Sequence, residues 1–270
     1  MKRLSLKTSV WLWIVATIIT LAAAIYQRGT GPTYPVRGRV TVGSSSIKYK
    51  LLRSADATAD AMITIPVLDR TVTGELTYKR YKSNDEWTTS PMQRVGDDLV
   101  GALPEQPPAG KMMYSVNLMD GEGRKTALTA APVVLRFKGA VPFYILHPHI
   151  FFMFFSMLVG TRCGLEAMFH GDRARRMAIE TAAMLFVGGM ILGPIVQKYA
   201  FGAFWTGWPF GHDLTDNKTA FAMLFWVIAL WRDRTGKGRP WYMLAAVMQL
   251  VVYSIPHSVL GSEIDYTKKV

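Results

Sequence analysis

The chain combines long apolar runs with a region of short alternating segments. Five runs are nearly free of charged residues, and they cover residues 10–24, 141–159, 177–196, 219–231 and 241–260. A helix needs about 20 mostly apolar residues to cross the hydrocarbon core of a bilayer. The pattern therefore predicts a membrane α-helical bundle with five transmembrane helices.

Between residues 30 and 139 polar and apolar residues alternate in short segments. Alternation with period two is typical of strands, and Gly, Pro, Asn and Asp mark the turns between them. The clearest predicted strands cover residues 37–42, 47–52, 62–65, 73–78, 112–118 and 133–137. About seven short strands in about 100 residues predict an inserted all-β immunoglobulin-like sandwich.

These two patterns predict three domains in chain order. Residues 1–29 form an N-terminal transmembrane anchor, residues 30–139 an extracytoplasmic β-sandwich, and residues 140–270 a four-helix membrane domain. The single cysteine, Cys163, excludes an intrachain disulfide, so we expect the sandwich to be held by its own core.

The formal net charge is +12, and the distribution of the cations favours a membrane protein. Basic residues precede the first apolar run and fill the regions 162–176 and 232–239. These are alternate loops, and cytoplasmic loops carry an excess of Lys and Arg. We expect a multi-pass protein of a bacterial inner membrane, with a cytoplasmic N-terminus and with the sandwich and the C-terminus in the periplasm. A nucleic-acid partner would need a basic face on one soluble domain, which the distribution excludes.

Four of the five histidines fall on the outer side of this topology. They are His147, His149, His212 and His257. A neutral imidazole is the usual protein ligand of haem iron and of copper or zinc. The spacing of His147 and His149 points their side chains apart on a helix, unless Pro148 breaks it.

The segment 200–218 has the most unusual composition in the chain. It is crowded with aromatic residues, glycines and ionisable groups, which makes it too apolar for a solvated loop and too polar for a buried helix. Such a loop is typical of the membrane–water interface. We expect Phe204, Trp205 and Trp208 to form a stacking surface there.

Residues 201–208 followed by Asp213 resemble the tryptophan-rich (WWD-type) motif of the haem-handling membrane proteins of cytochrome c biogenesis. In that family a Trp-Gly-x-x-Trp-x-Trp-Asp loop on the outer face shields a haem held by histidines that precede and follow it. The resemblance covers residues 141–260. Phe201 stands where the first tryptophan would be, Gly207 is inserted between the later two, and the family has more helices.

The resemblance implies a haem site that faces the outside and serves haem handling or electron transfer. His149 and His257 would be the axial ligands, with His147 as a substitute for the first. The aromatic side chains of the segment 200–218 would stack on the macrocycle.

Two alternatives remain open at the level of sequence. One is a divalent-metal site of His212, Asp213 and Asp216, because mixed carboxylate and imidazole ligands suit a divalent cation. The other is a non-catalytic subunit or assembly factor of a membrane redox complex, with the sandwich as a partner-docking domain. The expected partners are membrane lipid and other membrane or periplasmic redox proteins. Common hydrolase and nucleotide-binding motifs do not occur, which favours a protein that is not an enzyme by itself.

Overall fold

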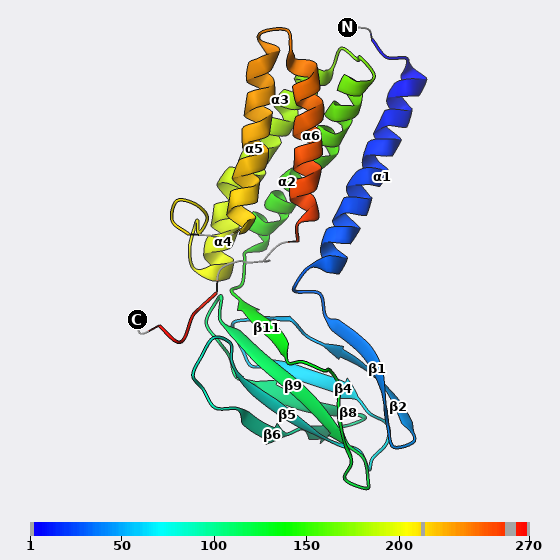
Figure 1. Cartoon of the computed structure of the whole chain (residues 1–270), viewed down its shortest axis with the longest axis vertical. Helices are drawn as coiled ribbons and strands as arrows, with labels where there is room; N and C mark the ends of the chain where they lie inside the picture. The colour runs from blue at the N-terminus through cyan, green and yellow to red at the C-terminus, as the bar shows by residue number, and fades with distance from the viewer. Residues whose placement is uncertain (1–2, 212–213, 257–262, 269–270) are drawn as a thin grey trace. The chain divides into compact units, whose positions relative to one another are not determined.

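The computed structural model of the chain describes residues 3–211, 214–256 and 263–268. The chain forms two compact units, which we call the helical unit and the β domain (Figure 1). The helical unit combines Met1–Pro32, Val141–Tyr199 and Ala203–Gly261. The β domain combines Thr33–Ala140 with Ala200–Gly202 and Ser262–Val270.

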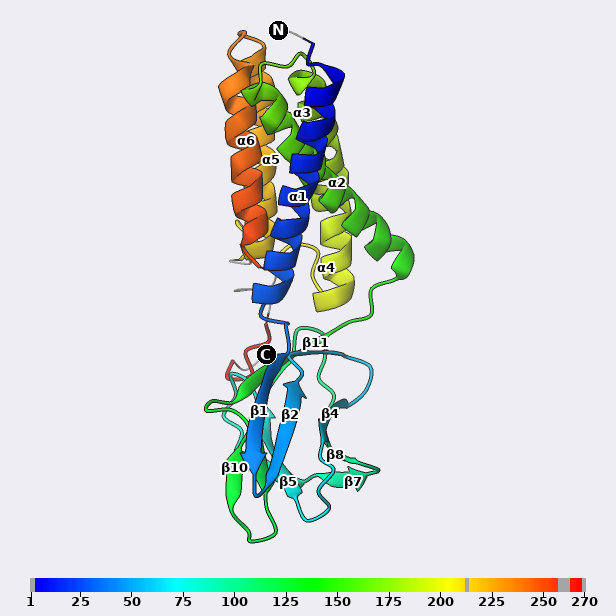
Figure 2. The same cartoon turned by 90° about the vertical axis from the view of Figure 1, so that its right-hand side faces the viewer.

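The helices of the helical unit lie alongside one another (Figure 2). One of them changes its hydrogen-bond pattern along its length, from α3 through the π-helical segment η1 to α4. The elements are α1 (Leu6–Thr30), α2 (Phe143–Met168), α3 (Ala174–Leu185), η1 (Phe186–Leu192), α4 (Gly193–Phe201), α5 (Leu214–Asp233) and α6 (Gly238–Ser254).

The prediction of five transmembrane helices is wrong. Within the described residues, three helices are long and apolar enough to cross a membrane, namely Leu6–Thr30, Phe143–Met168 and Ala174–Phe201. The last of these comprises α3, η1 and α4 together. The chain is therefore not a five-span membrane bundle.

Length and buried charge explain why α5 and α6 differ from the three spans. The apolar part of α5, residues 219–231, is only about 20 Å long at 1.5 Å per residue, against roughly 30 Å of hydrocarbon. The first turns of α5 add Asp216 and Lys218, which are both buried. Helix α6 has 17 residues in the part of the chain that the structure describes.

Glycines on α2 allow the neighbouring helices to approach closely. A Cβ atom on Gly160 would overlap Oε1 of Gln249 and lie 3.0 Å from Cζ2 of Trp226. A Cβ atom on Gly164 would lie 2.6 Å from Cβ of Ala246. Small residues at this spacing are typical of close helix packing in membrane proteins.

The β domain contains strands at each of the six clearest predicted positions and additional short ones. They form three sheets, of order β1-β2, β3-β11-β9-β5-β6 with β10 on β9, and β4-β8-β7. The strands are β1 (Val36–Val42), β2 (Ser45–Leu51), β3 (Ser54–Asp56), β4 (Ala61–Pro66), β5 (Thr73–Arg80), β6 (Thr88–Pro91), β7 (Gln93–Val95), β8 (Asp98–Leu103), β9 (Lys111–Met119), β10 (Lys125–Ala127) and β11 (Val133–Lys138).

This arrangement corrects the predicted immunoglobulin-like sandwich of about seven strands. The residues do form a β domain, but its described part has eleven strands in three sheets, and β11 pairs with β3 in parallel. The short strands β3, β7 and β10 each have three residues, too few to show an alternating pattern in the sequence.

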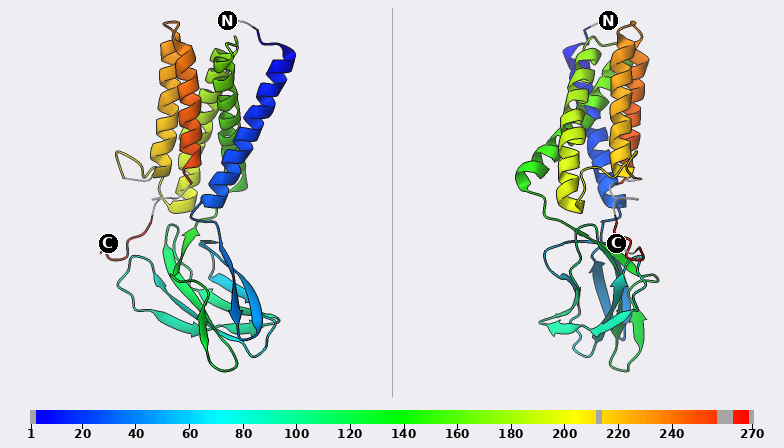
Figure 3. Two further views of the ribbon diagram at one scale, coloured as in Figure 1. Left: turned by 45° about the vertical axis from the view of Figure 1, so that its right-hand side comes forward. Right: turned by 90° about the vertical axis from the view of Figure 1, so that its left-hand side faces the viewer.

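Figure 3 shows the strands of the β domain from two further sides, and one apolar core joins its sheets. Strand β9 alternates between buried and partly exposed residues along its whole length, as the sequence pattern predicts. Gly101 of β8 leaves room for Leu76 of β5, because a Cβ atom there would lie 2.9 Å from Cδ2 of Leu76. The sheets that contain β5 and β8 therefore pack closely face to face.

Residues 263–268 belong to the β domain and are fixed to it by specific contacts. Glu263 forms ion pairs with Lys82 and Lys111. The Tyr266 hydroxyl donates to Oε1 of Gln106 at 3.0 Å. Burial raises the pKa of Glu263, but the hydrogen bonds from Lys111 and Lys82 outweigh it and hold the pKa below its ordinary value.

Candidate functional site

The histidines of α2 contact different neighbours, because the helix continues through Pro148. Nδ1 of His147 lies 2.9 Å from the carbonyl oxygen of Phe143 in the same helix, and the side chain is exposed. Nδ1 of His149 lies 2.8 Å from the carbonyl oxygen of Gly188 in η1, and the side chain is partly buried. His149 is thus held between two helices, whereas His147 is held by its own helix.

The π-helical segment determines which nitrogen of His149 carries a proton. The carbonyl of Gly188 accepts a hydrogen bond from the amide of Gly193, five residues later, and a second one from His149. A carbonyl oxygen only accepts hydrogen bonds, so Nδ1 of the imidazole must be the donor. In the neutral ring the lone pair is then on Nε2. Single π-helical turns occur frequently at functional sites.

Asp216 organises the aromatic segment from the first turn of α5. Its Oδ2 accepts hydrogen bonds from the amide of Thr206 at 2.7 Å, from the amide of Gly207 at 3.0 Å and from Nε2 of Gln197 at 3.1 Å. The side chain is buried. A carboxylate at a helix N-terminus is also favoured by the helix dipole. These contacts fix the backbone of the segment between α4 and α5.

The aromatic side chains of this segment remain largely accessible. Trp208 is 76% exposed and Phe204 56% exposed. Nε1 of Trp205 donates to the carbonyl of Trp208 at 3.1 Å, and the amide of Trp208 donates to Oδ1 of Asn217 at 2.7 Å. Nζ of Lys198 lies 5.6 Å from the ring centroid of Phe204. The backbone is held while flat aromatic faces stay available to a ligand or to lipid.

Three of the predicted site residues, His212, Asp213 and His257, lie outside the described residues. The structure therefore places His147, His149, Phe204, Trp205, Trp208 and Asp216. Among the residues that it describes, no group of three or more His, Cys, Asp and Glu side chains could hold a metal ion.

A buried hydrogen-bond network between α2, α5 and α6 could not be predicted from the sequence. Nε1 of Trp226 donates to Oε1 of Gln249 at 2.9 Å, and Nε2 of Gln249 donates to Oγ of Ser156 at 3.3 Å. The hydroxyls of Ser156 and Tyr253 are 3.2 Å apart, and both donate to the carbonyl of Met153. The sequence shows polar residues inside apolar runs but not which of them meet.

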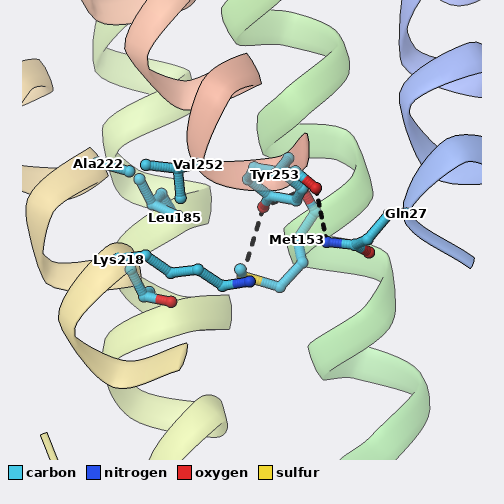
Figure 4. A pocket seen from close by; sticks show the side chains of 8 residues that line it. Gln27, Met153, Leu185, Lys218, Ala222, Val252 and Tyr253 are labelled. Atoms are coloured by element: carbon cyan, nitrogen blue, oxygen red, sulfur yellow. Dashed lines mark hydrogen bonds between the residues drawn. The ribbon is translucent and has the colours of Figure 1, made fainter. Parts of the chain in front are cut away.

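A small cavity of about 10 Å³ lies beside this network (Figure 4). That volume is on the scale of one water position. The side chains of Gln27, Met153, Lys218 and Tyr253 line it, together with Leu185 of α3 and apolar residues of α5 and α6. Nζ of Lys218 donates to the carbonyl of Ile255 at 2.6 Å, and Nε2 of Gln27 donates to the carbonyl of Tyr253 at 2.8 Å. Helices α1, α5 and α6 are therefore tied together by polar contacts.

A second buried polar cluster surrounds Arg162, which the sequence pattern places in a cytoplasmic loop. Arg162 lies inside α2 and forms an ion pair with Glu166, with 2.6 Å between NH1 and Oε2, and both side chains are inaccessible. Its guanidinium lies 5.5 Å from the ring centroid of Trp13 in α1. Oε1 of Glu166 accepts a hydrogen bond from the amide of Arg173. The pair thus connects α2 with α1 and with the turn before α3.

No protein-family model, no curated protein and no solved structure matches the chain. Evidence for the function of the site therefore comes from the geometry of its own residues. The most informative contact is the hydrogen bond between His149 and Gly188.

Proposed function

We propose that the chain is a membrane protein whose helical unit binds haem through His149, and that it serves haem handling or electron transfer. The observation that carries the proposal is the hydrogen bond from Nδ1 of His149 to the Gly188 carbonyl, which directs the lone pair to Nε2. Histidines that bind metals usually donate their other ring nitrogen to a carbonyl or carboxylate. When bound, haem would supply an iron centre for electron transfer.

The geometry favours His149 over His147 as the ligand. In both residues Nδ1 lies at a carbonyl oxygen. The imidazole of His147 is exposed and contacts its own helix, so its side chain can rotate to another conformation. The ring of His149 is partly buried and tied to a second helix, so its orientation is fixed before a ligand arrives. His257 remains the predicted second axial ligand.

The aromatic segment supports the same proposal. Asp216 and Asn217 hold the backbone, and Trp208 and Phe204 present accessible rings that suit the face of a macrocycle. In this proposal Asp216 positions the segment and binds no metal. In the divalent-metal alternative, a cation at Oδ2 of Asp216 would compete with the hydrogen bonds from the amides of Thr206 and Gly207.

We also propose a location in a bacterial inner membrane with the β domain in the periplasm. Basic residues at the N-terminus favour a cytoplasmic start. With three crossings, the chain that follows Ala174–Phe201 is on the same side of the membrane as the chain that follows Leu6–Thr30.

The test is the visible spectrum of the full chain, purified in detergent after expression with added haem. We expect a Soret band that shifts on reduction, is lost in His149→Ala and is kept in His147→Ala, the matched control. A colourless protein, or equal loss in both variants, would contradict the proposal. Stoichiometric metal without a Soret band would favour the divalent-metal site. A colourless protein in a stable larger complex would favour the accessory-subunit alternative.

A further inference from the structure

A groove on the β domain lies between two strands that are not hydrogen-bonded to each other. Its volume is about 510 Å³, and residues of β1, β2 and β4 line it. Within the described part of the chain, β2 pairs only with β1, and β4 pairs only with β8. Each of the two strands therefore has one edge that is outside any sheet ladder, and β2 and β4 contact each other along the groove. The hairpin β1-β2 and strand β4 are visible in Figure 2.

The charged side chains of the groove are all basic. Arg37, Lys48 and Lys50 line it, and no acidic residue among those that the structure describes does. None of these three cations forms an ion pair with another residue that the structure describes. The apolar side chain of Met62, which is half exposed, lies beside them on β4.

The register of the hairpin places like charges opposite each other. Arg37 is the cross-strand partner of Lys50, and Arg39 is the partner of Lys48. All four side chains are exposed. Like charges at directly opposed positions of an antiparallel pair destabilise it. An anionic ligand on this face would remove that repulsion.

The free strand edges indicate the shape of the ligand. An exposed edge pairs readily with an added strand, which gains main-chain hydrogen bonds, while its side chains give specificity. Successive side chains of a strand alternate between faces, so Lys48 and Lys50 lie on the same face about 7 Å apart. A strand with acidic side chains at every second position matches both features.

We propose that this groove binds an extended acidic segment of a partner protein as an added strand. Main-chain hydrogen bonds to the free edge of β2 or β4 hold the segment. Its alternate Asp or Glu side chains lie against Lys48, Lys50 and Arg37. The same cations repel the basic hairpin of a second copy of this chain, so the groove selects a foreign acidic strand. The proposal does not depend on haem.

The probe is a fluorescein-labelled peptide of alternating Glu and Val, titrated with the full chain in phosphatidylcholine nanodiscs and followed by anisotropy. We expect saturable binding that weakens as salt is added, because the contacts are exposed ion pairs. The double substitution Lys48→Glu/Lys50→Glu should weaken binding at least about tenfold, because it replaces attraction by like-charge repulsion. The matched control, Arg234→Glu/Lys237→Glu, changes the net charge equally in the helical unit and should leave binding unchanged.

A second peptide separates strand addition from simple charge attraction. N-methylation of every second amide removes the donors of one strand edge without changing the charge. When the amides that face the groove are methylated, we expect at least about tenfold weaker binding.

The proposal is overturned by non-saturable binding, by equal affinities of the two charge variants, or by undiminished binding of both N-methylated registers. An effect of the lysines only on binding to phosphatidylglycerol vesicles would also overturn it. Circular dichroism of each variant verifies that the β domain is folded.

Discussion

The helical unit and the β domain keep their polar side chains in different places. Of the twelve buried polar or charged residues in the described part of the chain, Gln106 and Arg136 belong to the β domain and the other ten to the helical unit. The core of the β domain is built from aliphatic and aromatic side chains, and ion pairs such as Arg80–Asp85 lie near its surface.

The proposed location of the helical unit in lipid and of the β domain in water would explain this difference. Lipid cannot hydrogen-bond to polar groups, so a helix that crosses a membrane must satisfy them inside the protein. In water, apolar burial stabilises a domain and polar groups stay at the surface. Interior polar contacts therefore add to apolar packing in connecting the helices, whereas apolar packing alone dominates between the sheets. Four substitutions test whether the two units differ in this way.

The largest effect is expected for Glu166→Gln in α2. It leaves the guanidinium of Arg162 buried without its counter-charge, which should lower the free energy of unfolding by about 3–5 kcal/mol. The measurement is urea unfolding in detergent, followed by the far-ultraviolet signal of the helices. The matched control is Glu180→Gln, which breaks an exposed pair with Arg176 at the same spacing and should cost about 0.5 kcal/mol or less. Equal effects would remove the distinction between interior and surface pairs.

A comparable test of the β domain is Leu76→Ala. Leu76 is fully buried against Gly101, so the substitution leaves a cavity and should lower stability by about 3 kcal/mol. Unfolding of the full chain, monitored at wavelengths that report strand structure, measures the loss. Leu68→Ala is the control, because Leu68 is 79% exposed, and it should change little. A loss below about 1 kcal/mol would show that the apolar core is not what holds this domain.

An intermediate effect is expected for Gln249→Leu in α6. The substitution removes the acceptor of the Trp226 indole and a donor to Ser156, which should cost about 1–2 kcal/mol. Trp226→Phe and the double variant complete a double-mutant cycle. A favourable coupling of about 1 kcal/mol would confirm that the two side chains act together. Additive losses would mean that the hydrogen bond contributes nothing.

The smallest effect is expected for Asp85→Asn at the surface of the β domain. The hydrogen bond from Arg80 lowers the pKa of Asp85 to about 2. Because the folded pKa is below the unfolded one, the contribution is present above about pH 4 and disappears as the pH falls through about 2. The pair is partly exposed, so the loss at pH 7 should be under about 1 kcal/mol. The free energy of unfolding, measured between pH 2 and pH 7, should depend less on pH in Asp85→Asn than in the unsubstituted chain. The same pH dependence in both would contradict a stabilising role of the Asp85 carboxylate.

The strands that match the sequence patterns are those in which alternation extends over a whole segment. Strand β9 is an example, since residues 112–118 show the period of two that exposure of alternate faces requires. The parallel pairing of β3 with β11 depends on contacts about 80 residues apart, and no local pattern encodes it. The span count was wrong in part because the apolar part of α5 begins only after Asp216 and Lys218, which are buried inside the protein.

The candidate site was predictable in residue type but not in geometry. The sequence marks His149 as an ionisable group in an apolar helix, and Asp216 as a residue near a helix start. It does not show that a π-helical turn brings the Gly188 carbonyl to His149, because that acceptor is a backbone atom 39 residues away. The hydrogen-bond partners of Gln249 and Lys218 could not be predicted from the sequence either, because they depend on which helix faces pack together.

Haem binding through His149 is tested by imidazole rescue of His149→Gly in the full chain. The substitution removes the ligand and leaves space for a free imidazole. We predict that the Soret band lost in purified His149→Gly returns when haem and imidazole are added together but not when haem is added alone, while His147→Gly keeps its band without imidazole. An unchanged Soret band in His149→Gly before imidazole is added would contradict coordination of haem by His149.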